Sequence, residues 1–158
     1  CPGKLILAAY DLAKQWVEQS ITVISGFHSP IERECLNILL RGKQPIILCP
    51  SRSIETLRIP EQYKCPLEEG RLLILSPFGT KYHRMSNKMS WERNQFVAAL
   101  ADTIFVVHAE TQSKTEQLCQ EIRSWQKPIY TFPGNENLLA FGTTLHQTKK
   151  TKIGMEIV

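Results

Sequence analysis

Residues 21–40 combine the features of an anion-binding turn. The apolar run that opens this segment ends at Ser25 and Gly26, and Ser29 is a natural N-cap for the helix that follows. Glu32 lies three residues after Ser29, so the helix start is marked by a capping box. Such a start turns backbone N–H groups and the positive end of a helix dipole toward the edge of a sheet, where anions are favoured. The alternative is an ordinary connection between a strand and a helix.

A second candidate site is a basic, aromatic segment later in the chain. Its cations are interleaved with Tyr82 and Trp91 and are opposed only by Glu92; they are Lys81, His83, Arg84, Lys88 and Arg93. Cations follow the phosphates of a single strand and aromatic rings stack on its bases, each stack contributing about 1–3 kcal/mol. The alternative is a solvated loop whose Trp91 and Met89 pack on the core.

Individual residues have distinct expected roles in phosphate binding. Arg93 is the strongest candidate, because a guanidinium bridges phosphate oxygens with two donors, and Asn94 beside it can donate to a phosphate or a base edge. His28 is interpreted as a phosphate donor or a structural residue rather than a general base, since a helix N-terminus disfavours its protonated form. Ser113 and Lys114 begin another helix whose N-terminus suits a phosphate.

Helical and strand patterns alternate along the chain. Helices are predicted at 5–18, 30–40, 91–100 with Ser90 as cap, 114–125 and 136–141, and strands at 21–25, 45–48, 72–76, 103–108 and 128–131. Only short helical pieces, at 54–57 and near Leu67, are expected between 51 and 70. The strands are too apolar for one solvated face, so the predicted fold is a Rossmann-like, doubly wound, mainly parallel sheet with helices on both faces.

The start of the chain is unusual for this architecture, which normally opens with a strand and a phosphate-binding turn. Pro2 and Gly3 resemble the end of such a turn, and the first strand is therefore predicted to be missing from this chain. A native start at the helix is the alternative. Residues 1–142 are predicted to form the Rossmann-like domain, and residues 143–158 a basic tail whose strand-like end would add an edge strand.

Composition excludes several classes of protein. The chain has 158 residues, 42% of them hydrophobic and 22% charged, which is typical of one globular domain, and its net charge of +4 favours an anionic partner. Five cysteines without a CxxC pair match neither a disulfide framework nor a zinc site, and no metal or other cofactor is expected. No apolar run is long enough to span a bilayer and no signal peptide opens the chain, so a cytoplasmic location is expected.

Taken in order, these motifs resemble the DNA-processing protein A (DprA/Smf) family. The resemblance runs from about Gly3 to Gly142 and is carried by Ser25-Gly26, Arg93-Asn94, the strand 104–107, the Ser113-capped helix and Pro133-Gly134. The resemblance implies an extended Rossmann fold that binds single-stranded DNA, forms a homodimer and helps to load the RecA recombinase during natural transformation.

The chain also departs from the family pattern. The family continues its Ser-Gly with a small residue and Arg-Gly-Ile-Asp, whereas this chain has the residues Phe27 to Glu32, with a histidine and no arginine in the turn. Gln95 replaces the second arginine of the Arg-Asn-Arg motif, and Gln112 replaces the glycine before Ser113. The chain is therefore expected to be a short, divergent relative.

Two classes of function follow from these observations. The first is a DprA-like, single-stranded DNA-binding protein without catalysis. The second is a small-molecule site, either a protein that binds a nucleotide or phosphoribosyl ligand or a phosphoribohydrolase resembling the LOG proteins. The PGGxGTxxE signature of those enzymes is missing, and Glu116 is better explained as a capping partner of Ser113. A scaffold that dimerises through apolar surface and binds no ligand is a third alternative.

Overall fold

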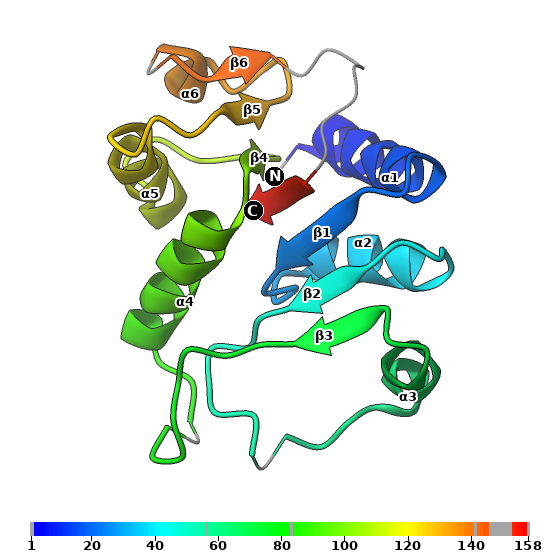
Figure 1. Ribbon diagram of the computed structural model, residues 1–158. Coiled ribbons are helices and arrows are strands. Elements are labelled where there is room, and N and C mark those ends of the chain that lie inside the picture. The colour runs from blue at the N-terminus through cyan, green and yellow to red at the C-terminus, as the bar shows by residue number, and fades with distance from the viewer. Residues whose placement is uncertain (1, 56, 83, 141, 146–152, 158) are drawn as a thin grey trace.

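The computed structural model describes residues 2–55, 57–82, 84–140, 142–145 and 153–157, in which seven parallel strands form one sheet (Figure 1). The strand order is β3-β2-β1-β7-β4-β5-β6. The strands are β1 (Thr22–Ser25), β2 (Ile46–Leu48), β3 (Leu72–Ile74), β4 (Thr103–Val106), β5 (Ile129–Thr131), β6 (Thr144–Leu145) and β7 (Ile153–Ile157). The helices are α1 (Gly3–Glu18), α2 (Pro30–Leu40), α3 (Glu61–Glu68), α4 (Asn87–Leu100), α5 (Lys114–Arg123) and α6 (Glu136–Ala140). The predicted doubly wound, Rossmann-like fold is confirmed.

Successive strand residues point to opposite faces of the sheet and build two separate cores. Val23 of β1 and Phe105 of β4 pack with α1 and α2, whereas their neighbours Ile24 and Ile104 pack with α4 and α5. Helix α3 adds Tyr63 to the first core. Because both faces are covered, the strands read as continuous apolar runs rather than alternating ones.

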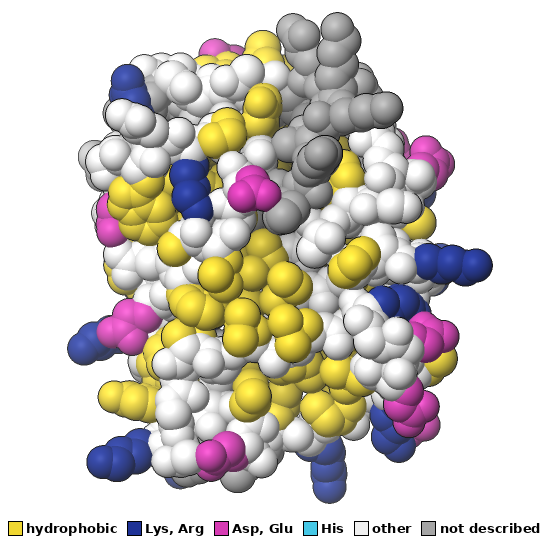
Figure 2. Space-filling model, in the orientation of Figure 1, with side chains coloured by type: hydrophobic (Ala, Val, Ile, Leu, Met, Phe, Trp, Pro, Cys, Tyr) yellow, Lys and Arg dark blue, Asp and Glu magenta, His cyan; other side chains and the backbone are white. Residues whose placement is uncertain are grey.

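Part of the α4 face is less fully covered. Figure 2 shows hydrophobic side chains gathered in the middle of this face, with Lys and Arg side chains around its periphery. The side chain of Leu73 in β3 is 51% exposed, and that of Leu100 at the end of α4 is 49% exposed. Helix α4 therefore shields this side of the sheet incompletely at the β3 edge.

Helix α4 begins one turn earlier than its sequence indicates. The hydroxyl oxygen of Ser86 accepts a hydrogen bond from the Met89 N–H at 3.2 Å, and Ser86 is the N-cap. The prediction that Ser90 caps this helix is therefore wrong. As a consequence Lys88 lies on the first turn of a helix rather than in a loop, and its position is set by the helix axis.

Helix α3 was not expected as a continuous element. It spans Glu61–Glu68 with Pro66 inside it, where only a turn near Leu67 was predicted. A proline removes one hydrogen bond of a helix and normally ends it, which is why the pattern indicated short pieces. Packing of Tyr63 and Leu67 against the first core stabilises the helix despite the proline.

Strand β7 lies in the middle of the sheet, not at its edge. It pairs with β1 in the register Thr22↔Ile153 and with β4 in the register Thr103↔Gly154, while β6 is the edge strand of the C-terminal segment. This central place, next to the strand that follows α1, is where a strand preceding α1 would pair in a doubly wound sheet. The last strand of the chain thus joins the two halves of the sheet. The lysines of the predicted tail, Lys149, Lys150 and Lys152, lie outside the described residues.

Side chains secure the ends of the helices. The Lys127 ammonium group donates hydrogen bonds to three carbonyl oxygens at the end of α4, those of Ala98, Ala99 and Ala101, at 2.5–2.8 Å. A cation is favoured there because carbonyl groups leave partial negative charge at a helix C-terminus. Helix α4 is thereby held against the start of β5.

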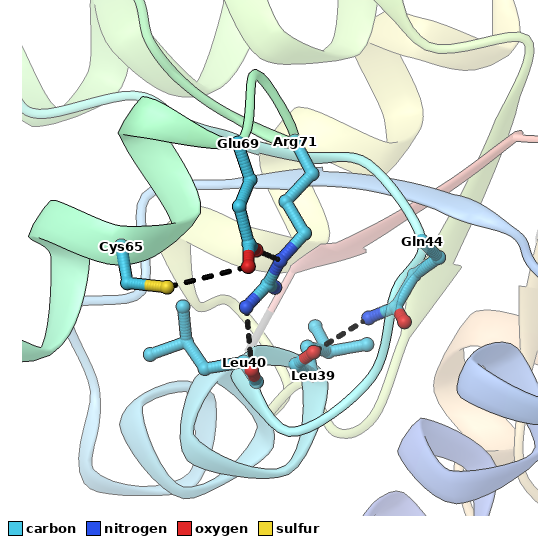
Figure 3. A network of polar contacts seen from close by, with 6 residues as sticks. All are labelled: Leu39, Leu40, Gln44, Cys65, Glu69 and Arg71. Carbon is cyan, nitrogen blue, oxygen red and sulfur yellow. Dashed lines mark hydrogen bonds and ion pairs between the residues drawn. The ribbon is translucent and has the colours of Figure 1, made fainter.

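A second set of contacts secures the end of α2 at the amino edge of the sheet (Figure 3). There the Arg71 Nη2 donates to the Leu40 carbonyl at 3.1 Å, and the Gln44 Nε2 donates to the Leu39 carbonyl at 2.8 Å. The Glu69 carboxylate pairs with Arg71 Nε at 2.6 Å and orients the guanidinium. These contacts hold the C-terminus of α2 against the segments that lead into β2 and β3.

Hydrogen exchange tests the position of β7. Because β7 has a partner on each side, its successive N–H groups bond alternately to β1 and β4, and we expect residues 153–157 to exchange as slowly as β1. Exchange of β6, which has one neighbour, is the internal control and should be faster. Mass-spectrometric or NMR-detected exchange measures both. Exchange of residues 153–157 at the rate of an unstructured peptide would contradict the central strand.

Candidate nucleic-acid interface

Arg93 lies at the carboxyl edge of the sheet, buried between the ends of β1 and β2. Its side chain comes from α4, and the residue is only 5% exposed. The Nη1 donates to the Cys49 carbonyl at 2.9 Å, and the Nε donates to the Asn94 Oδ1 at 2.7 Å. The guanidinium occupies the space that a side chain at position 26 would fill, so Gly26 is required by this close approach. Arg93 and Gly26, far apart in sequence, form one unit.

The buried charge of Arg93 is only partly compensated. Loss of water lowers the pKa of Arg93, while the Glu32 carboxylate acts in the opposite direction. Glu32 is 7% exposed, yet among the described residues it forms no ion pair with Arg93 within 4.0 Å. The two opposite charges therefore lie near each other without direct contact.

Glu32 binds the donors that the sequence assigned to a phosphate. Its Oε2 accepts hydrogen bonds from the backbone N–H groups of His28 at 3.0 Å and Ser29 at 2.8 Å, and its Oε1 accepts from the Ser25 hydroxyl at 2.7 Å. The predicted capping box is confirmed. In this arrangement the N-terminus of α2 already holds an internal anion, and an external phosphate would have to compete with it.

His28 lies at the surface beside this network. Its Nε2 is 3.3 Å from the hydroxyl oxygen of Ser51, a fully buried residue that follows β2. The surrounding protein removes enough water from the ring to lower the pKa of His28, and the nearby Arg93 lowers it further. The imidazole is therefore more strongly neutral at pH 7 than an ordinary histidine.

The start of α5 repeats the arrangement at α2. Ser113 caps the helix by accepting from the Glu116 N–H at 3.2 Å, and Glu116 Oε2 accepts from the Gln112 N–H. Glu116 Oε1 accepts from the Asn137 amide at 2.8 Å. Like Glu32, Glu116 is buried, at 4% exposure. Helices α2 and α5 thus each have a buried carboxylate of the protein at the N-terminus.

A hydrogen-bond network also orients His108 after β4. The amide nitrogen of Asn135 donates to the Val107 carbonyl at 2.9 Å and to the Thr131 hydroxyl, which leaves Asn135 Oδ1 as an acceptor. His108 Nδ1 lies 2.9 Å from that oxygen and is therefore the donor. The network ties the ends of β4 and β5 to the loop before α6.

A groove between α4 and α5 brings two predicted lysines together with an aromatic ring. The groove has a volume of about 240 Å³ and is lined by Asn87, Lys88, Trp91, Lys114 and Gln117. Trp91 packs against the second core with one part of its ring and lines the groove with another. The Lys88 ammonium is 3.8 Å from the Glu92 carboxylate, and Lys114 has no ion-pair partner among the described residues. We call these five residues the α4–α5 groove.

Other predicted residues do not line this groove, and they differ in exposure. Lys81 and Arg84 are exposed in the loop that precedes α4, beside Tyr82, which is 52% exposed. The Tyr82 ring packs at a tilt against Phe78 with centroids 6.0 Å apart. Asn94 is partly buried, and its side-chain oxygen accepts the hydrogen bond from Arg93 Nε. His83 lies outside the described residues.

Sequence reasoning missed three residues of this region. Asn87 was missed because α4 was predicted to begin after it, and Gln117 because a polar helix residue has no distinctive signal. The position of Gln117, three residues after Lys114, places both on one side of α5. Nothing in the local sequence of Ser51 indicates its contact with His28, since they are 23 residues apart.

The described residues contain no group of three or more His, Cys, Asp or Glu side chains able to hold a metal ion. Over the same part of the chain, no helix is both long and apolar enough to cross a membrane.

Comparisons with known proteins agree with this architecture. DNA processing protein A from Streptococcus pneumoniae has 16% sequence identity and a TM-score of 0.73, covering 92% of this chain and 54% of that protein. DNA processing protein A from Helicobacter pylori, described for its unique single-stranded DNA binding mode, has 19% identity and a TM-score of 0.71, covering 90% of this chain and 68% of that one. These likenesses show the fold, and this chain spans about half the length of the first.

No curated protein matches the chain. A sequence model of one family does match it, that of DNA recombination-mediator protein A, over residues 3–154. The match covers nearly the whole chain, including Arg93 and the α4–α5 groove. The chain belongs to the DNA recombination-mediator protein A (DprA) family.

Proposed function

We propose that this chain binds single-stranded DNA in DNA processing and recombination, without catalysis, and that the α4–α5 groove is its main contact. The observation that carries the proposal is the meeting of Lys88, Trp91 and Lys114 around one groove. Family membership supports the process, and the Helicobacter pylori relative is described for single-stranded DNA binding.

The groove supplies the two interactions that a single strand needs. Lys88 and Lys114 come from different helices and can contact successive phosphates, while the indole of Trp91 offers a face to a base. Because one part of the indole packs on the core, the ring loses little freedom when a base stacks on it. Lys81 and Arg84 in the neighbouring loop extend the positive surface.

Arg93 has a different part in the proposal from the exposed lysines. Its burial and its bond to the Cys49 carbonyl hold it beneath the surface next to Gly26, where it adds positive potential and bonds to Asn94. The predicted donors of Ser25, Gly26, His28 and Ser29 belong to the turn after β1, next to Arg93, and Ser113 at the start of α5 is a separate candidate. Contacts of a phosphate with these groups stay a prediction, because Glu32 and Glu116 hold several of the N–H groups.

The remaining parts of the proposal follow the family. They are a homodimer, a RecA-type recombinase as protein partner, a cytoplasmic location and a role in natural transformation. An exposed apolar surface that includes Leu73 and Leu100 is available for a protein contact.

Binding of fluorescently labelled oligothymidine over a salt series tests the groove. Replacing Lys88 and Lys114 by alanine removes two phosphate contacts, so the slope of log affinity against log salt should become less steep by about 0.7 per contact. Affinity at low salt should fall at least tenfold. Fluorescence anisotropy measures both quantities.

A double variant of equal charge serves as the control. Lys14 and Lys43 are exposed and lie away from the groove, and their replacement by alanine removes the same two charges. A loss of affinity equal to that of the groove variant would show that binding is not localised at the groove. No binding by the unaltered chain at low salt would refute the proposed function.

Replacing Gly26 by alanine tests the unit formed by Gly26 and Arg93. The added methyl group overlaps the Arg93 guanidinium, so we expect unfolding free energy to fall by about 1–3 kcal/mol, as for other overpacked sites. Urea denaturation measures the change. Gly79→Ala is the control, because no atom lies within 4 Å of a methyl group there. Equal stability of the two variants would contradict the close approach of Arg93.

The lowered pKa of His28 predicts a dependence of stability on pH. The unfolded chain binds the proton at the ordinary pKa of about 6.5, above the value in the fold, so acidification favours unfolding. The contribution of His28 is therefore fully present above pH 6.5 and declines as the pH falls below it. Urea denaturation at pH 7.5 and 5.5 should show a smaller decline for His28→Asn than for the unaltered chain. An identical decline would contradict this prediction.

A further inference from the structure

A second pocket lies between α1, α2 and α3, separate from the α4–α5 groove. Its volume is about 510 Å³, within the range of sites for small organic ligands. Helix α2 supplies Pro30, Ile31, Arg33, Glu34, Leu36 and Asn37, α1 supplies Ile6 and Tyr10, and α3 supplies Gln62 and Tyr63. None of these residues belongs to the surface proposed above for DNA phosphates.

The pocket has aromatic and aliphatic walls. Tyr10 comes from α1, which precedes α2 in the sequence, and Tyr63 comes from α3, which follows it. Both rings are partly buried against the first core. Ile31 and Leu36 are buried below them. Such walls favour a flat, weakly polar group that can contact ring faces.

Several polar side chains of the pocket have no hydrogen-bond partner among the described residues. Among the described residues, none donates a hydrogen bond to or accepts one from the side chains of Tyr10, Arg33, Asn37, Gln62 or Tyr63. Arg33 and Gln62 are exposed at the rim, whereas Tyr10, Asn37 and Tyr63 are partly buried. The polar groups of the pocket are thus available to a ligand.

We infer that this pocket binds a nucleobase. The side-chain amides of Asn37 and Gln62 each offer a donor and an acceptor, as the edge of a base requires, and the tyrosine rings offer faces for stacking. The guanidinium of Arg33 suits the phosphate attached to that base. A hydrocarbon chain fits less well, because it would form no hydrogen bond with either amide or with Arg33.

The nucleobase has two possible sources. Pro30 and Ile31 line the pocket directly after Ser29, so the pocket adjoins the turn of residues 25–29, and a base of a bound single strand can reach it. A free mononucleotide presents the same base and phosphate. The first source rests on the proposed function, whereas the second is independent of it.

Two measurements on the full chain distinguish these sources. Calorimetric titration with AMP and TMP measures mononucleotide binding. Oligothymidine that carries 5-iodouracil is photocrosslinked to the chain, and mass spectrometry locates the crosslinked residues. Each measurement is repeated with the double variant Tyr63→Leu/Asn37→Ala, in which leucine keeps an apolar side chain at position 63. Gln120→Ala, an exposed position on α5, is the control.

We expect saturable binding of a mononucleotide or a crosslink at Tyr10 or Tyr63. The double variant should lower that signal at least tenfold, and Gln120→Ala should leave it unchanged. Oligonucleotide binding with crosslinks only at Tyr82, together with no mononucleotide binding, would overturn the inference and leave the proposed function standing. Mononucleotide binding without oligonucleotide binding would refute the proposed function and support the pocket. Absence of both mononucleotide and oligonucleotide binding would overturn both proposals. Mononucleotide binding that the double variant retains would overturn the inference about the pocket but not the proposed function.

Discussion

The buried guanidinium of Arg93 is the interaction on which the carboxyl edge of this protein depends. A charge removed from water must be solvated by the protein, and here the Cys49 carbonyl and the Asn94 side chain supply hydrogen bonds while Glu32 supplies opposite charge nearby. This requirement explains why position 26 has no side chain. Because Arg93 belongs to α4, the same contacts set how that helix lies across the sheet. The positions of Lys88 and Trp91 on α4 follow from it.

The charges at this edge separate into an internal and an external set. Glu32 and Glu116 bind the N–H groups at the starts of α2 and α5, so the positive ends of two helix dipoles are neutralised within the protein. Lys88 and Lys114 lie at the surface, where Lys114 has no ion-pair partner among the described residues and Lys88 has only its exposed contact with Glu92 at 3.8 Å. This division favours binding to an extended polyanion along the surface over deep capture of one phosphate. The same division agrees with the sequence of the turn after Gly26, which lacks the arginine that the family has there.

Much of the fold could be predicted because its signals are local. The capping box from Ser29 to Glu32 involves residues three positions apart, and the predicted bounds of α2 agree with the structure. The start of α4 and the whole of α3 could not be predicted in the same way. Both Ser86 and Ser90 are suitable N-caps for α4. Burial of Met89 favours the longer helix that Ser86 caps. In α3, tertiary contacts of Tyr63 outweigh the local effect of Pro66.

The sequence by itself determined the alternation of helices and strands, the parallel sheet, and the residue types able to bind a single strand. These properties follow from periodicity and capping, which act over a few residues. Only the tertiary structure decided that Arg93 is buried over Gly26, that β7 joins the halves of the sheet, and that Lys88 meets Lys114 across a groove. Each of these depends on contacts between residues more than 20 positions apart. No local pattern specifies such contacts, because they result from the packing of whole elements.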